Sequence, residues 1–154
     1  MRYRESRRLD LPRERIFAVV ADIERYPDFV PGWESARVLA RDKNGLTVEQ
    51  GVGIGPVLKT FHSRARIEAP SRIKIESIDG PFRKLEIDWS FVPGESGDCS
   101  VNLAVDLQSR GGITGRFIEA NFDTVARRLI PLFVDRVRAI QRRGQRDVPR
   151  RHPG

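Results

Sequence analysis

The residues of this chain that could carry acid–base or nucleophilic chemistry are few and scattered. His62 is the only histidine before His152, and the ordinary pKa of histidine, near 6.5, makes it the first candidate for proton transfer. It alternates with Phe61 and Ser63 along an extended segment, so we expect it on the opposite face, pointing to water. The sequence contains no nucleophile paired with a base, no phosphate-binding loop and no cluster of three metal ligands, so no catalytic residue and no metal site are predicted.

A charged pair and a lone thiol complete the candidates for chemistry. Glu5 and Arg7 lie in phase with Tyr3 and Leu9 on the first extended segment. The pair either enters an internal cavity, where it would be the best starting point for catalysis, or lies on an exposed first strand. Cys99 is the only cysteine, which excludes an internal disulfide, and its place in an apolar strand is typical of a core residue.

Three aromatic residues lie close together on one connector of the chain. Tyr26, Phe29 and Trp33, with prolines between them, place much rigid apolar surface on a single loop. Such a loop can be a lid over a cavity, an edge that touches a membrane, or a plug that closes the end of a sheet. The sequence leaves these alternatives open.

Extended segments elsewhere supply the walls of the expected cavity. Trp89 and Phe91 share one face of a strand, where such residues either contact a ligand or fill the core. Gln50 and Ser63 fall in phase with the apolar residues of their strands, so we expect them to provide the polar contacts that orient a ligand. The predicted ligand-binding residues are Tyr26, Phe29, Val30, Trp33, Gln50, Phe61, Ser63, Leu85, Trp89, Phe91, Val101, Phe122, Val125 and Leu129.

The elements that must position these residues are indicated by periodicity and by turn residues. Residues 2–11 alternate and stop at Pro12, which predicts a strand followed by a helix, because proline is tolerated in a first helical turn. A second short helix is predicted to end near Pro27. Residues 33–108 have a period of two, and turn signals divide them into five to six further strands.

A long amphipathic helix is predicted after the strands. Leu85 and Ile87 alternate with charged residues, so one face of the sheet is apolar and must be covered. Apolar residues recur at helical spacing over residues 113–143, which predicts a helix of about 30 residues and roughly 45 Å, long enough to cross the sheet. Pro131 interrupts this helix, and we expect a bend there.

Positive charge is concentrated at the end of the chain. Of the net charge of +7, residues 136–154 contribute +6, from seven Arg and one Asp, and the preceding 135 residues contribute +1, from 21 basic and 20 acidic residues. We expect one domain over residues 1–141 and a basic, disordered tail over residues 142–154. The tail could contact anionic lipid or ribosomal RNA, or could only improve solubility. The arginines of this tail are Arg142, Arg143, Arg146, Arg150 and Arg151.

The location of the protein is predicted from its apolar segments and its charged start. The longest apolar runs fall far short of the roughly 20 residues that a membrane-spanning helix needs. The first residues are charged and alternating, and are typical of neither a signal peptide nor a transit peptide. A cytoplasmic protein is therefore expected.

Two motifs resemble those of a known family. Residues 26–31 (Tyr-Pro-Asp-Phe-Val-Pro) resemble the Tyr-Pro-x-Phe-Val-Pro-Trp-Cys segment of the START-like coenzyme Q-binding, polyketide cyclase family. Residues 80–93 are similar to that family's Gly-Pro-Phe-(basic)-x-Leu-x-x-x-Trp-x-Phe-x-Pro strand. Gly32 stands where the family has tryptophan, and Trp33 follows one residue later. Because a shift of one residue reverses the face of an extended chain, the place of Trp33 at the ligand mouth stays open.

The resemblance covers essentially residues 2–141 and implies a fold and several functions. The implied fold is α+β and helix-grip (START/Bet v 1-like), with a curved antiparallel sheet of six to seven strands around a long C-terminal helix and two short helices after the first strand. The first implied function is a carrier or chaperone for a polyisoprenoid quinone such as ubiquinone, or a similar lipid, that supports respiratory quinone function at the inner face of the membrane; no other cofactor is expected. Bacterial relatives named as ribosome association toxins imply a ribosome-binding protein instead. A polyketide cyclase or dehydratase is the third alternative, for which the sequence provides few convergent polar groups.

Overall fold

The structure, a computed structural model, describes residues 1–147. One strand, two short helices, a run of strands and a long helix follow one another, which confirms the predicted α+β helix-grip order. The elements are β1 (Arg2–Leu9), α1 (Arg13–Ala21), the 3-10 helix η1 (Ile23–Asp28), β2 (Trp33–Asp42), β3 (Gly45–Ile54), β4 (Val57–Glu68), β5 (Arg72–Ser77), β6 (Phe82–Pro93), β7 (Cys99–Ser109) and α2 (Gly112–Asp147).

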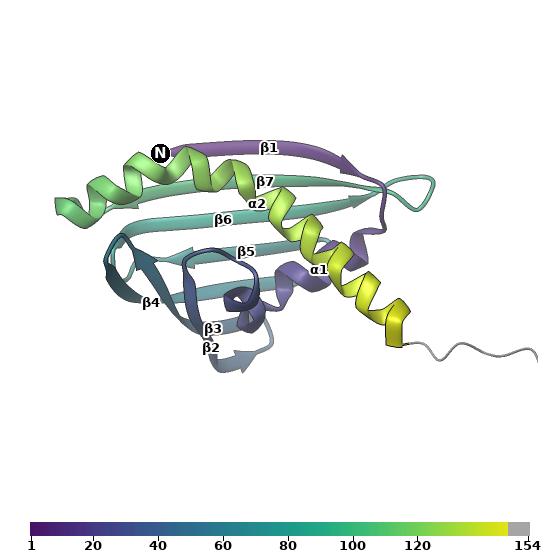
Figure 1. Cartoon of the computed structure of the whole chain (residues 1–154), viewed down its shortest axis with the longest axis horizontal. Helices are drawn as coiled ribbons and strands as arrows, with labels where there is room; N and C mark the ends of the chain where they lie inside the picture. Colours follow the sequence, from purple (N-terminus) through teal and green to yellow (C-terminus); the bar gives the residue numbers. More distant parts are fainter. Residues whose placement is uncertain (148–154) are drawn as a thin grey trace, which may run out of the picture.

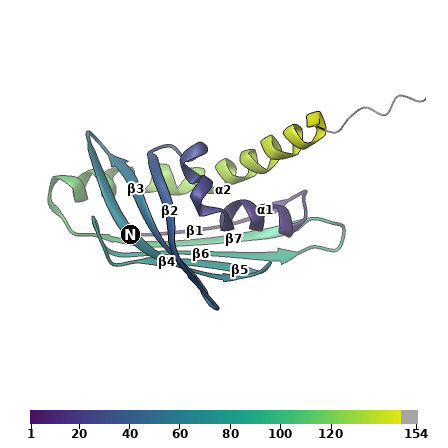
Figure 2. The same cartoon turned by 90° about the horizontal axis from the view of Figure 1, so that it is seen from below.

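The strands form one antiparallel, 7-stranded sheet in the order β1-β7-β6-β5-β4-β3-β2. From β2 to β7 the strands are a simple meander, and β1 pairs with β7 over its whole length, from Arg2 opposite Asp106 to Leu9 opposite Cys99. Figure 2 shows β2 and β3 running at a steep angle to β5, β6 and β7. The sheet is therefore curved, and its concave face is turned toward the helices.

The helices lie together on the concave side of the sheet (Figure 2). α2 crosses the sheet and changes direction along its length (Figure 1), as expected for a helix with Pro131 in its interior, because the proline ring removes a backbone hydrogen bond. α1 packs beside α2 and against β5, β6 and β7. Within residues 1–147, no helix has the length and apolar character needed to cross a membrane.

α2 is longer than predicted. It continues through Asp147, so residues 142–147, which were predicted to begin a disordered tail, extend the helix instead. Arginine and glutamine are good helix formers, and adding residues to an existing helix avoids the cost of nucleation. The remaining part of the predicted tail, with Arg150 and Arg151, lies outside the described residues, as does the side chain of Arg146.

The core lies between the concave face and the helices. Leu85, Trp89 and Phe91 of β6 are buried, as the alternation along that strand predicts, and Val101 of β7 is fully buried beside them. Cys99 is also buried, and burial raises the pKa of its thiol, which fits a core residue rather than a nucleophile.

Candidate ligand-binding cavity

An apolar cavity lies between α2 and the concave face of the sheet. Its inner part has a volume of about 40 Å³ and is closed by the Tyr26–Trp33 connector. Its outer part, of about 200 Å³, opens toward solvent beside α2. The two parts adjoin, since both are bordered by Trp33, Leu85, Ile87 and Leu129.

The structure brings most of the predicted ligand-binding residues together at this cavity. Tyr26, Val30, Gln50, Phe61 and Trp89 line the inner part, and Phe122 and Val125 line the outer part. Trp33, Leu85 and Leu129 line both. The placement follows from the fold, whereas the contact of these residues with a ligand stays a prediction.

Four predicted residues lie outside the cavity lining. Phe91 packs edge-on against Phe17 of α1, with ring centroids 5.7 Å apart, and Val101 is buried on the neighbouring strand. Phe29 turns toward α2, where its ring centroid lies 5.2 Å from that of Phe133. Ser63 lies behind Gln50 rather than on the cavity surface.

Several lining residues were missed. In the inner part these are Ile75, Ile87 and Phe133. In the outer part they include Val52, Ile54, Phe82, Val105, Leu107, Phe117, Ile118 and Ala126. Each lies on a predicted strand or on the predicted long helix, but periodicity assigns only a face, and it does not say which part of that face borders a cavity.

The inner part of the cavity contains one buried amide. Gln50 is 2% exposed; its Oε1 accepts a hydrogen bond from Trp33 Nε1 at 2.7 Å, and its Nε2 donates to Ser63 Oγ at 2.7 Å. The hydroxyl of Tyr26, another residue that lines the inner part, donates to the carbonyl of Val20. Burial strongly raises the pKa of Tyr26, so its hydroxyl stays neutral.

A β-bulge places Trp33 in the cavity and resolves the question left open by the sequence. Trp33 pairs with Val52, and Ser35 pairs with Gly51, so Glu34 is an extra residue on β2. One extra residue reverses the alternation along a strand. The bulge therefore turns Trp33 to the concave face, although it stands one residue later than the family's tryptophan.

Arg136 of α2 fastens the connector that closes the inner part. Its side chain is only 14% exposed, and its guanidinium carbon lies 5.2 Å from the centroid of the Phe29 ring. The Arg136 Nη2 also lies 3.7 Å from Asp28 Oδ2. Cation–π and ionic contacts thus hold residues 28 and 29 against α2.

Replacing Arg136 with Ala is expected to loosen this connector. The lost contacts are worth about 1–2 kcal/mol, which corresponds to roughly 5- to 30-fold more frequent local opening. Hydrogen exchange measures this opening through the backbone amides of Val30 and Trp33, which bond to the carbonyls of Tyr26 and Val30. Arg138→Ala, at an exposed site on the same helix, is the control. Equal exchange rates in both variants would exclude a role for Arg136 in holding the connector against α2.

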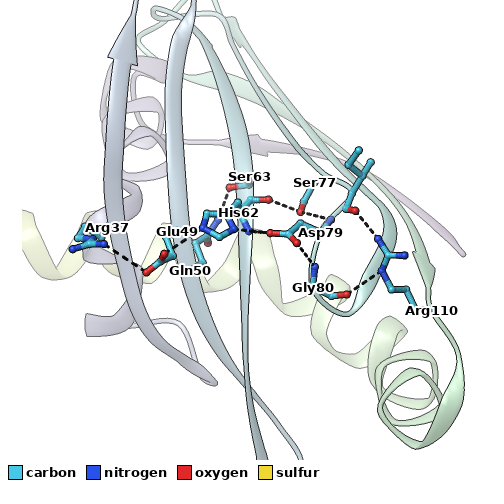
Figure 3. Close-up of polar contacts among 10 residues, drawn as sticks. Arg37, Glu49, Gln50, His62, Ser63, Ser77, Asp79, Gly80 and Arg110 are labelled. Carbon is cyan, nitrogen blue, oxygen red and sulfur yellow. Dashed lines mark hydrogen bonds and ion pairs between the residues drawn. The ribbon is translucent and has the colours of Figure 1, made fainter.

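His62 lies on the outer face of the sheet, as predicted, but it is part of an ionic cluster rather than simply solvated. Its Nδ1 lies 2.6 Å from Asp79 Oδ2 and its Nε2 lies 3.2 Å from Glu49 Oε2 (Figure 3). The same Asp79 oxygen also accepts the backbone N–H of His62 at 2.9 Å. Asp79 lies beyond the last residue of β5, so this bond joins β4 to the segment after that strand. The hydrogen bond to Asp79, helped by Glu49, raises the pKa of His62.

The raised pKa of His62 predicts a pH-dependent contribution to stability. A group whose pKa is higher in the folded state stabilises the fold below its unfolded pKa, near 6.5, and loses this effect as the pH rises through the folded value. The difference in unfolding free energy between the unmodified protein and His62→Gln is therefore expected to be larger at pH 5.5 than at pH 8.5. Urea unfolding at both pH values measures it, and a difference that does not change with pH would contradict the assignment.

Glu5 and Arg7 pair with each other at the edge of the sheet instead of entering the cavity. Arg7 Nη2 lies 2.6 Å from Glu5 Oε1, and the Tyr3 hydroxyl donates to Glu5 Oε2 at 2.9 Å. Arg7 is 41% exposed, and neither residue borders the inner or the outer part of the cavity. The pair therefore lies on an exposed first strand, which was the second of the two alternatives left open by the sequence.

The curved sheet, the crossing helix and the apolar cavity between them define a START-like helix-grip protein. A START superfamily protein from Mycobacterium smegmatis has the same fold, with a TM-score of 0.76 at 19% sequence identity over 90% of this chain and 98% of that one. Residues 9–134 match the family described as polyketide cyclase / dehydrase and lipid transport, and the chain belongs to this family.

Two relatives of known name are similar in sequence. Ribosome association toxin RatA of Escherichia coli K12 is 29% identical over 116 residues, which cover 75% of this chain and 71% of the toxin. The mitochondrial coenzyme Q-binding protein COQ10 homolog B of Xenopus laevis is 28% identical over 151 residues, which cover 96% of this chain and 61% of the relative.

Proposed function

We propose that the protein is a carrier or chaperone that binds a polyisoprenoid quinone, or a lipid of similar shape, in the cavity beneath α2. The observation that carries the proposal is the pair of adjoining apolar spaces, one beside the buried Gln50 and one with an exposed mouth beside Val125. The name of the Xenopus relative, a coenzyme Q-binding protein, supports the ligand class. Burial of apolar ligand surface, at about 25 cal/mol per Å², drives binding.

Ligand entry requires the cavity to open. Its two parts, of about 40 and 200 Å³, are smaller than the roughly 300–1,000 Å³ of typical small-molecule sites. The connector of residues 26–33 moves away from α2 to admit the head group. The tail of the bound ligand then extends through the outer part toward solvent. Phe117 and Val125, 45% and 51% exposed beside this mouth, then touch the membrane that supplies the ligand.

Native mass spectrometry with lipid extraction tests this proposal on protein purified from a host that makes quinones. A bound isoprenoid quinone near stoichiometry is the expected result. Recovery of the same amount of quinone from Trp89→Ala, which removes a wall of the inner part, would place the ligand elsewhere. Protein that never carries a lipid, even after incubation with quinone-containing vesicles, would overturn the carrier function.

A second candidate function, ribosome binding, is favoured by the arginines of α2. Arg116, Arg127, Arg128, Arg138 and Arg142 are exposed and form no ion pair with the side chains that the structure describes. Such cations bind phosphates with a steep salt dependence. Co-sedimentation with ribosomes that falls steeply between about 50 and 200 mM salt, and is lost in Arg138→Glu/Arg142→Glu but kept in Lys43→Glu, would support this function.

A further inference from the structure

The inner part of the cavity is able to distinguish the head groups of ligands. Apart from Gln50, the side chains around it are aliphatic or aromatic; the indole N–H of Trp33 is already bonded to Gln50, and the hydroxyl hydrogen of Tyr26 is bonded to the carbonyl of Val20. The outer part adds a single further amide, Asn121. Asn121 already donates to the carbonyl of Phe117 at 2.8 Å. Gln50 is therefore the polar group on which the head group of a deeply bound ligand must rely.

The orientation of the Gln50 amide is determined by its neighbours. The indole N–H of Trp33 can only donate a hydrogen bond, so the oxygen of the amide must face Trp33 and its nitrogen must face Ser63. Figure 3 shows Gln50 and Ser63 joined across β3 and β4. The amide is thus held between two fixed partners, and it cannot exchange donor and acceptor to suit a ligand.

Half of the hydrogen-bonding capacity of Gln50 is still available. A glutamine amide offers two N–H donors and two acceptor lone pairs, and one of each is used by Ser63 and Trp33. One N–H and one lone pair remain on a side chain that lines the cavity and is 2% exposed. An uncharged carbonyl can accept a hydrogen bond from the free N–H, and a hydroxyl group can accept from this N–H or donate to the free lone pair. Leaving these groups unsatisfied is costly.

A charged head group, which needs a partner of opposite charge, finds none in the inner part of the cavity. The residues around the inner part provide no cation for a carboxylate and no anion for an ammonium, and the raised pKa of Tyr26 keeps its hydroxyl neutral. Burial of an unpaired charge in such surroundings is far more costly than burial of a neutral polar group. The same alkyl chain should therefore bind well or poorly according to the charge of its head.

We propose that the Trp33–Gln50–Ser63 chain selects amphiphiles with an uncharged hydrogen-bonding head group and excludes carboxylates such as free fatty acids. This inference rests on the proposed function, because it assumes that the cavity takes up an apolar ligand with its head at the inner end. The inference adds discrimination between head groups, which an apolar lining alone would not provide. Gln50 is the residue that determines this specificity.

Four probes of equal chain length test the selection: decyl methyl ketone, dodecanol, dodecanoate and dodecane. Their affinities are measured at pH 8 through the fluorescence of Trp33 and Trp89, which both border the inner part. The ketone and the alcohol are expected to bind about 3- to 10-fold more tightly than dodecane. Dodecanoate is expected to bind at least about 100-fold more weakly than the ketone, and to gain affinity as the pH falls toward about 4–5.

Two variants test the role of Gln50. In Gln50→Leu the ketone is expected to lose its advantage over dodecane; since both are measured on the same protein, a change in stability does not affect the ratio. Gln50→Glu keeps an acceptor for Trp33 but has no amide donor. The affinity of the ketone should therefore fall by about tenfold more than the affinity of the alcohol. Equal binding of all probes, or tightest binding of dodecanoate, would overturn the selection rule while leaving the carrier function intact. Failure of every probe to bind would overturn both.

Discussion

Replacing Ala126 with Phe is expected to abolish the proposed tight binding of a short-chain ubiquinone while leaving the protein folded. Ala126 is 3% exposed and borders the outer part of the cavity from α2, so a phenyl ring there takes the place of the ligand. Excluding roughly 100 Å² of apolar ligand surface costs about 2.5 kcal/mol, close to a hundredfold in Kd. Quenching of Trp33 and Trp89 fluorescence by the quinone measures this change.

The control for this variant lies on the other side of the same helix. Ala120 is exposed, so Ala120→Phe introduces the same ring without reaching the cavity, and its Kd should equal that of the unmodified protein. Overpacking at position 126 is expected to cost no more than about 1–3 kcal/mol, which thermal unfolding measures separately. If folded Ala126→Phe protein bound the quinone with unchanged affinity, the ligand site could not be this cavity.

Replacing Gly80 with Ala is expected to produce the second large effect, a loss of about 2–4 kcal/mol of stability. Gly80 has a φ of 62°, in the left-handed region that side chains disfavour. An added Cβ would lie 2.6 Å from the carbonyl oxygen of Thr60 and 2.8 Å from Cβ of Phe61. Neither neighbour can move freely, because both belong to β4 and Phe61 lines the cavity.

Gly97→Ala separates the two causes of this effect. Gly97 has a φ of 75°, but no heavy atom lies within 4 Å of an added Cβ, so only the backbone cost of about 1–2 kcal/mol applies. For a domain of this size, Gly80→Ala should lower Tm by about 5–15 °C and Gly97→Ala by a few degrees. Equal shifts would mean that the close approach of Gly80 to β4 does not matter.

β6 illustrates how much of the site the sequence could predict. Alternation along the strand was enough to place Leu85, Trp89 and Phe91 on one buried face, because the side chains of a strand have a period of two. It could not divide this face between core and cavity. α1 covers Phe91 through Phe17, whereas Leu85 and Trp89 border the cavity. The position of α1 on the sheet depends on contacts between distant residues, which a local period does not contain.

Trp33 and Gln50 illustrate the same limit for individual side chains. The strict alternation of an extended chain could not assign Trp33 to a face, because the bulge at Glu34 depends on how β2 pairs with β3. Gln50 could be placed on the inner face from its phase alone, and the structure buries it there. Its hydrogen bonds to Trp33 and Ser63 join residues of three strands, and only the paired sheet brings them together.

The sequence by itself determined the order and type of the elements, the apolar face of the sheet and the outward direction of His62. Periodicity and turn residues are local properties of the chain, so they can be read without a fold. Only the tertiary structure decided where the cavity lies, which apolar residues border it, and how Arg136 fastens the connector. These features depend on the curvature of the sheet and on the path of α2 across it, which result from all the packing contacts acting together.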